Sequence, residues 1–215
     1  MRRRQMTQQV LKGLFLAVLI LASCSAPSDN GAGGGCGGSE ASVTCLNVTG
    51  IVPTSLGKDT TNVDARQDQC RDQTGAVTGV EPFGDHNARV TLVNKQFPTT
   101  TATGRAFDIG IIEFSITYSL NSPCPVAALG CPPLTGLTSG ESITIPAGQT
   151  VTVTLPFVPI SVKNQYVQAG GTLGPAAPSY TATYTFTAQT ISLVETFTVQ
   201  GSAPFTITDF NNCAK

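Results

Sequence analysis

Apolar and polar positions alternate along most of the chain from about Val43 onward. In 112–120, an apolar residue occupies every second position, with Glu, Ser and Thr between them, and the same period of two recurs in 150–155 and 180–187. A period of two with many β-branched residues is typical of half-buried antiparallel strands. Further candidate strands are 89–93, 142–145, 195–199 and 205–208.

Turn signals separate these runs. The segment Pro-Ala-Gly-Gln at 146–149 predicts a hairpin between 142–145 and 150–155. A short helix is expected within 63–72, and no part after Cys24 shows a long period of 3.6 residues. Several short antiparallel strands in about 170 residues predict an all-β fold, an antiparallel β-sandwich of the immunoglobulin-like kind. The chain has no Trp, so this likeness is architectural only.

The first residues have the order of an export signal. Four basic residues, Arg2, Arg3, Arg4 and Lys12, precede an apolar run at 14–22, which is much shorter than the roughly 20 residues of a membrane span. We therefore predict a signal helix with an ordinary export route. The run ends in Leu21-Ala22-Ser23-Cys24, which resembles the lipobox of bacterial lipoproteins. The alternative is a simple signal peptide followed by a chance cysteine.

The lipobox resemblance implies cleavage after Ser23 and a diacylglyceryl group on the Cys24 thiol, with a fatty acid such as palmitate on the new amino terminus. Several acyl chains together make anchoring stable. The expected organisation is a signal peptide at 1–23, a flexible Gly/Ser-rich tether at 24–42 and a β-sandwich domain at 43–213. Ser25 follows the cysteine, and by the sorting pattern of such lipoproteins it favours the outer membrane.

Removal of 1–23 changes the charge. All four basic residues of that segment leave with no acidic residue, so the formal charge moves from −1 to −5. An acidic chain argues against nucleic acid as a partner, because that binding depends on Lys and Arg at phosphates. It also argues against a basic patch for anionic lipid. Membrane attachment must therefore come from lipid on Cys24.

Six further cysteines support an oxidising compartment: Cys36, Cys45, Cys70, Cys124, Cys131 and Cys213. An even number in an exported chain predicts disulfide bonds. Cys124 and Cys131 bracket a single loop, so we expect them to be paired. Pairing of Cys36 with Cys45, and of Cys70 with Cys213, is a weaker expectation, because six thiols allow fifteen connectivities.

Candidate chemistry is sparse, and we expect no metal and no cofactor. No Cys-x-x-Cys or Gly-x-Ser-x-Gly occurs, and His86, the single histidine, is expected to be a solvent-facing turn residue. Calcium is an alternative at the densest polar stretch, although its spacing is not that of an EF-hand; the stretch contains Asp59, Asn62, Asp64, Asp68 and Asp72. A hydrolase with two carboxylates also stays open, drawing on Glu81, Asp85, Asp108, Glu113, Glu141, Glu195 and Asp209.

We therefore assign no catalytic residue and expect a membrane-anchored lipoprotein that is not an enzyme. Its domain is expected to act as a binding or scaffolding module for other envelope proteins, using strand edges or the Pro- and Gly-rich loops 121–138 and 168–179. The chain has thirty threonines, and the preference of Thr for solvent-facing strand positions accounts for this number. The alternative is a Thr-rich face for polysaccharide, which would make the chain a carbohydrate-binding lipoprotein.

Overall fold

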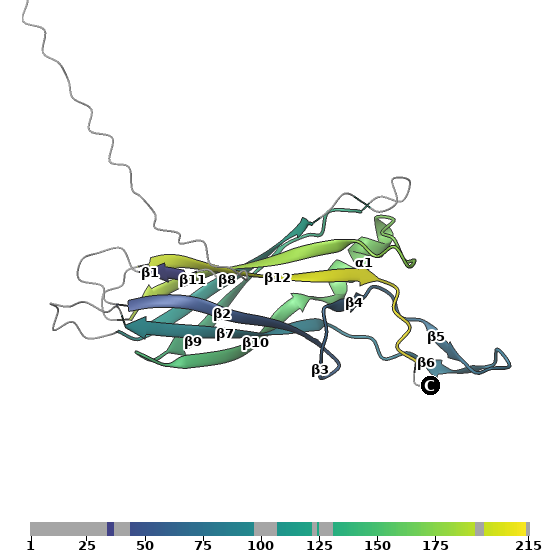
Figure 1. Ribbon diagram of the computed structural model, residues 1–215, viewed down its shortest axis with the longest axis horizontal. Helices are drawn as coiled ribbons and strands as arrows, with labels where there is room; N and C mark the ends of the chain where they lie inside the picture. The colour runs from purple at the N-terminus through teal and green to yellow at the C-terminus, as the bar shows by residue number, and fades with distance from the viewer. Residues whose placement is uncertain are drawn as a thin grey trace, which may run out of the picture.

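The computed structural model describes residues 34–36, 44–96, 107–121, 124, 131–191 and 196–213. These residues form two stacked sheets, a two-stranded hairpin and a helix (Figure 1). One sheet has the order β1 (Gly34–Cys36), β2 (Thr44–Ser55), β7 (His86–Gln96) and β10 (Thr150–Val158), with β3 (Lys58–Asp59) paired to β2. The other has the order β4 (Asn62–Asp64), β12 (Thr196–Thr208), β11 (Ser179–Thr190), β8 (Ile109–Leu120) and β9 (Leu137–Ile145). The hairpin contains β5 (Gln69–Arg71) and β6 (Val77–Val80), and the helix is α1 (Ile160–Gln168).

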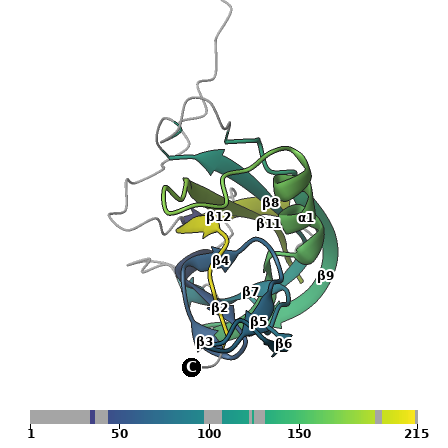
Figure 2. The ribbon, with the colours of Figure 1, turned by 90° about the vertical axis from the view of Figure 1, so that its right-hand side faces the viewer.

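The strand order confirms the predicted β-sandwich and follows the immunoglobulin arrangement. β2, β7 and β10 are antiparallel neighbours, as strands A, B and E are in that fold. β12, β11, β8 and β9 take the places of G, F, C and an added C′ in the facing sheet. The short β4 pairs parallel to β12. Figure 2 shows the layers from one end, with α1 beside the edge of the sandwich.

Aromatic side chains fill much of the space between the sheets. Phe157 of β10 meets Phe205 of β12 with ring centroids 5.3 Å apart, and Tyr184 stacks on Phe186 at 5.8 Å. All four tyrosines of the chain donate their hydroxyl groups to backbone carbonyls, namely Tyr118 to Phe157, Tyr166 to Thr172, Tyr180 to Pro132 and Tyr184 to Pro156. These bonds satisfy hydroxyl groups that would otherwise be costly to bury.

Along β8, the alternation of buried and exposed residues shifts by one position at Ile112. Ile109 and Ile111 are buried before it, Phe114 and Ile116 are buried after it, and Ile112 itself is exposed. The pairing of β8 with both β9 and β11 shifts register at this point, which identifies a β-bulge. The sequence alternation correctly placed Phe114 and Ile116 in the core but wrongly included Ile112, because one inserted residue moves the pattern to the opposite face.

The predicted hairpin across 146–149 is wrong, because β9 and β10 belong to different sheets. The intervening turn crosses the edge of the sandwich instead. The buried Asn94 side chain holds it by donating to the carbonyls of Ile145 and Phe107, at 3.0 and 2.9 Å. Asp108 accepts a hydrogen bond from the Ala147 amide at 2.9 Å.

Other element predictions also need correction. Residues 63–72 contain β4 and β5 rather than a helix, because the segment pairs with β12 and Ala65 donates to the Thr208 carbonyl at 2.8 Å. The two strands expected at 195–199 and 205–208 form the single strand β12. Gly34–Cys36, assigned to the tether, forms β1 and pairs with β2. The predicted signal helix lies outside the described residues.

The helix α1 was not predicted. Its inward face has only Val162, Lys163 and Tyr166, so the apolar period is short and is interrupted by a lysine. Asp85 accepts a hydrogen bond from the Ile160 amide at 2.7 Å at the start of the helix. Gly170, with φ of 79°, follows its end. No helix in the described part of the chain is long and apolar enough to cross a membrane.

Candidate functional site

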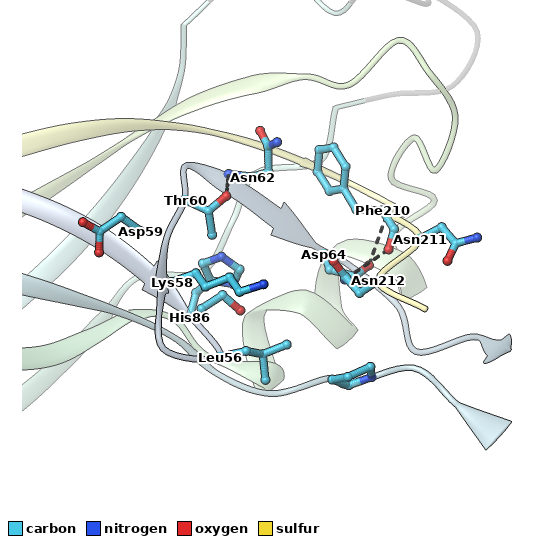
Figure 3. A pocket seen from close by; sticks show the side chains of 12 residues that line it. Leu56, Lys58, Asp59, Thr60, Asn62, Asp64, His86, Phe210, Asn211 and Asn212 are labelled. Carbon is cyan, nitrogen blue, oxygen red and sulfur yellow. Dashed lines mark hydrogen bonds between the residues drawn. The ribbon is translucent and has the colours of Figure 1, made fainter. Parts of the chain in front are cut away.

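A pocket of about 540 Å³ opens at one end of the sandwich (Figure 3). Four segments that are distant in sequence line it: the β2–β3 turn, the start of β4, the entry to β7, and the C-terminal segment 210–212. The lining residues are Ser55, Leu56, Lys58, Asp59, Thr60, Asn62, Asp64, Pro82, His86, Phe210, Asn211 and Asn212. This volume is in the range that small-molecule sites occupy.

His86 is a buried residue of the pocket wall and not the solvent-facing turn residue that the sequence predicted. It begins β7, its side chain is 1 % exposed, and neither ring nitrogen has a hydrogen-bond partner among the described residues. Burial and, to a lesser extent, the nearby positive charge of Lys163 lower the pKa of His86 to about 4, against a smaller opposing effect of the Asn62 backbone. The ring is therefore neutral at pH 7, with one donor and one acceptor nitrogen. Without a bonded carboxylate it lacks the orienting group of a Ser-His-Asp arrangement.

Lys163 is the other buried base at this end. It projects from α1, donates to the Gly84 carbonyl at 2.6 Å, and its Nζ lies 4.5 Å from the centre of the Phe83 ring. Burial lowers the pKa of Lys163 to about 8, and the charges of Asp64 and Asp85 oppose this effect. The ammonium group is thus held by a carbonyl and an aromatic face, which accounts for a structural role.

Three carboxylates form an acidic cluster beside the pocket: Asp64, Glu81 and Asp209, whose nearest oxygens lie within 4.8 Å of one another. Burial raises the pKa of Asp64 to about 6, and the charge of Glu81 adds to the effect. Burial also raises the pKa of Asp209, opposed by the positive charge of Arg66. Glu81 and Asp209 were both candidates for a carboxylate pair, and the structure does bring them together.

Hydrogen bonds to these carboxylates attach the C-terminal segment to the body of the domain. Asp64 accepts from the Phe210 amide at 3.2 Å and from the Asn212 side chain at 2.7 Å. Glu81 accepts from the Asn212 amide at 2.8 Å. Arg66 donates to Asp209 at 2.6 Å and to Asp68 at 2.9 Å. These carboxylates therefore have a structural role in holding the C-terminal segment and Arg66.

The five residues considered for calcium do not form one site. Asp59, Asn62 and Asp64 line the pocket, where Asp59 pairs with Arg89 at 2.9 Å. Asp68 pairs with Arg66, and Asp72 accepts bonds from the Thr74 and Ala76 amides within the β5–β6 turn. These are local structural roles.

The other carboxylate candidates lie elsewhere. Asp85 and Asp108 accept backbone hydrogen bonds at α1 and at the 146–149 turn, as described above. Glu113 and Glu141 are on β8 and β9 and do not line the pocket. Glu195 lies outside the described residues.

The disulfide pattern agrees with the sequence prediction. Cys70 is bonded to Cys213 and Cys124 to Cys131, each pair with Cα atoms 5.6 Å apart. Cys45 is also disulfide-bonded, and the residue opposite it on β1 is Cys36. Cys24 lies outside the described residues. The bond from Cys70 to Cys213 joins the β5–β6 hairpin to the C-terminal segment beside the pocket.

The two Pro- and Gly-rich loops meet at the junction of β8 and β11. Asn121 donates two hydrogen bonds to Ser179, from its backbone amide to the Ser179 carbonyl at 2.9 Å and from its side chain to the Ser179 hydroxyl at 3.0 Å. The loop 168–179 lies against β12, since the Ile207 amide donates to Pro178 and the Thr208 hydroxyl donates to Gly174. This loop therefore lies along β12.

Threonines and serines align across three strands on the outer face of the sheet that contains β8, β11 and β12. Thr183 of β11 lies between Thr117 of β8 and Ser202 of β12, and Thr185 lies between Ser115 and Gln200. Such rows agree with the Thr-rich face that the sequence suggested. High β-propensity at a solvent-facing strand position explains them equally well.

Most of the pocket could not be predicted from sequence. Leu56, Lys58, Pro82 and the C-terminal residues 210–212 carry no motif, and only the fold brings them together with Asp64 and His86. One available signal was Leu56-Gly57, a turn pair in which the first position is normally Asn or Asp.

Comparisons with known proteins give little further information. No family model matches the chain, and no curated protein matches it. Among solved structures, a protein from Archaeoglobus fulgidus is similar over 66% of this chain and 93% of that one, with 11% identity and a TM-score of 0.33.

Proposed function

We propose that this chain is a bacterial lipoprotein that displays its β-sandwich as a non-catalytic binding module of the cell envelope. The observation that carries the proposal is Leu21-Ala22-Ser23-Cys24 directly behind a basic start and a short apolar run. Lipid on Cys24 is the anchor, and Ser25 favours the outer membrane. The bonded cysteines of the domain support export, because disulfides persist in oxidising compartments.

The position of the pocket relative to the N-terminal end of the domain supports the proposal that the domain is displayed for binding. The chain enters the sandwich at β1 and the start of β2, and the pocket lies where β2 ends, at Ser55 and Leu56. Figure 1 shows β1 near the left end of the long axis and β3 and β4 towards the right, with the β5–β6 hairpin beyond them. Twelve residues of strand cover roughly 35–40 Å. An anchor before β1 would therefore be attached to the domain at a point distant from the pocket.

Membrane flotation of a Cys24→Ser variant tests the anchor. Wild-type protein is expected to float with the membranes. The variant, made with a cleavable secretory signal in place of residues 1–23, is expected to move to the soluble fraction, because neither the apolar run 14–22 nor a lipid then remains on it. Cys124→Ser is the matched control, since it loses a cysteine in a short loop and keeps the lipid site. A Cys24→Ser protein that still floats after a salt wash would contradict the proposal.

A paired assay tests whether the module is non-catalytic. The tagged protein is used to recover partners from solubilised envelopes and, separately, is incubated with glycoside, ester and peptide substrates. We expect recovered partners and no turnover. Turnover that disappears in Asp64→Asn or Asp209→Asn protein would identify the acidic cluster as the site of a hydrolase.

A further inference from the structure

We propose that the pocket at the β3–β4 end binds a neutral, polyhydroxylated ligand, namely a saccharide. The inference names the ligand class of the binding module proposed above and rests on that function. It depends on three features of the pocket: a strained apolar residue at its rim, a buried histidine with unbonded nitrogens in its wall, and a nearly balanced set of charged and amide groups.

Leu56 occupies an unfavourable backbone conformation at the pocket rim. Leu56 and Gly57 form the turn between β2 and β3, with φ of 50° and 78°, and Leu56 is the only described residue other than glycine with positive φ. Its side chain is 56 % exposed. A leucine without burial in a left-handed position costs stability that Asn or Gly would not cost. Such strain suggests that the side chain serves a contact with a ligand.

The wall offers hydrogen bonds that the protein does not use. The neutral His86 ring has one donor and one acceptor; neither nitrogen has a hydrogen bond of good geometry, and a backbone group of Asn62 lies near the ring. A hydroxyl group can serve either nitrogen, since it both donates and accepts, whereas a carboxylate or an ammonium can serve only one kind. Figure 3 shows His86 behind the exposed Lys58 side chain; because both ring nitrogens are buried, a ligand can reach them only if side chains of the pocket wall such as Lys58 move.

The remaining groups favour a neutral ligand with an apolar face. Arg89 pairs with Asp59 at 2.9 Å, and Lys58 and Asp64 have opposite charges, so the charges of the residues that line the pocket nearly balance one another. The Asn62 side-chain oxygen accepts from the Thr206 hydroxyl at 3.0 Å, and the Asn62 backbone amide donates to the Thr60 hydroxyl at 3.1 Å, so Asn62 is held in place with its side chain in the pocket lining. Phe210 and Leu56 provide apolar surface for the C–H face of a sugar ring.

His86 is also the reporter for the test, because a single histidine gives one set of imidazole NMR signals. Full-length mature protein, held in a detergent without a sugar head group, is titrated with glucose, N-acetylglucosamine and their β1,4-linked disaccharides. Glucuronate, inorganic phosphate and calcium chloride are the charged comparators. We expect a saturable shift of the His86 signals with at least one neutral saccharide and none with the comparators.

Leu56→Asn separates binding from folding. Asn tolerates the left-handed conformation, so the variant should melt at a higher temperature than wild type, yet bind the saccharide about fivefold more weakly because apolar contact is lost. Leu120→Asn is the control: Leu120 is similarly exposed, lies at the end of β8 outside the pocket lining, and should leave affinity unchanged.

Three results would overturn the saccharide proposal: no neutral saccharide shifts the signals, a charged comparator shifts them instead, or Leu56→Asn leaves the affinity unchanged. None of these results bears on the anchor. Conversely, a Cys24→Ser protein that stays with membranes would overturn the proposed function and leave a saccharide titration intact.

Discussion

At the scale of single residues, burial of His86 links stability to pH. The pKa of His86 is about 4 in the fold against an ordinary 6.5, so between these values the unfolded chain binds a proton that the fold does not. Stability from this group is therefore complete above pH 6.5 and is lost as the pH falls towards 4. Asp64 has the opposite effect on the pH dependence of stability. Its pKa is raised from 3.8 to about 6, so between these values the folded chain binds a proton that the unfolded chain does not, and stability from this group falls as the pH rises.

We predict that acidification from pH 6.5 to 4 lowers the unfolding free energy of wild type, relative to a His86→Leu variant, by about 3 kcal/mol. The comparison cancels the contribution of Asp64, which both proteins retain. Urea denaturation at several pH values measures the difference. An unchanged difference across this range would mean that His86 titrates in the fold as it does in the unfolded chain.

Lys163 affects a separate pH range. Its pKa is lowered from 10.5 to about 8, so the unfolded chain binds more protons between these values, and stability from this group rises as the pH increases from 8 to 10.5. His86 and Lys163 thus act in windows that do not overlap, which allows the two effects to be separated in one titration.

At the scale of elements, Gly201 sets how closely the sheets approach. It is buried within β12, and a Cβ atom at this position would lie 2.5 Å from a methyl group of Val48 on β2 in the facing sheet. Real Cβ contacts are not so short, so a side chain here must push the sheets apart or displace Val48 and Ile51.

We predict that Gly201→Ala destabilises the fold by about 1–3 kcal/mol, the usual cost of overpacking. Gly174→Ala is the matched control, because a Cβ atom there meets nothing within 4 Å and the residue does not have positive φ. Thermal unfolding of both variants measures the effect. Equal melting temperatures would show that the sheets adjust without cost at Gly201.

The elements also show how far the sequence determines the fold. Alternation correctly identified β8, β10 and β11, because each has one face in a shared core. It could not place the bulge at Ile112 or separate β9 from β10, since both depend on pairing with strands distant in sequence. α1 was missed because Lys163 interrupts its apolar face, and His86 was misplaced because its burial comes from packing near α1 and the C-terminal segment.

At the scale of the whole molecule, the bond from Cys70 to Cys213 closes most of the domain into one loop, with a sequence separation of 143 against 7 for Cys124–Cys131. In the chain-entropy estimate, the long loop contributes about 5 kcal/mol and the short one about 2.5 kcal/mol. The long-range bond also fixes the C-terminal segment that carries Phe210 and Asn212 into the pocket.

We predict that the double variant Cys70→Ser/Cys213→Ser loses about 2 kcal/mol more unfolding free energy than Cys124→Ser/Cys131→Ser. It should also lose any ligand response in the pocket, whereas the Cys124→Ser/Cys131→Ser control should keep it. Guanidinium denaturation of the two double variants gives the comparison. A larger loss in the short-loop variant would show that the 124–131 bond, and not the C-terminal one, supports the fold.

The central claim is that lipid on Cys24 anchors an exported sandwich, and the intact mass of the protein extracted from membranes tests it most directly. The account predicts a chain that begins at Cys24 and carries the added mass of a diacylglyceryl group, with or without an amide-linked fatty acid. A membrane-derived chain that retains residues 1–23, or that begins elsewhere without lipid, would contradict it.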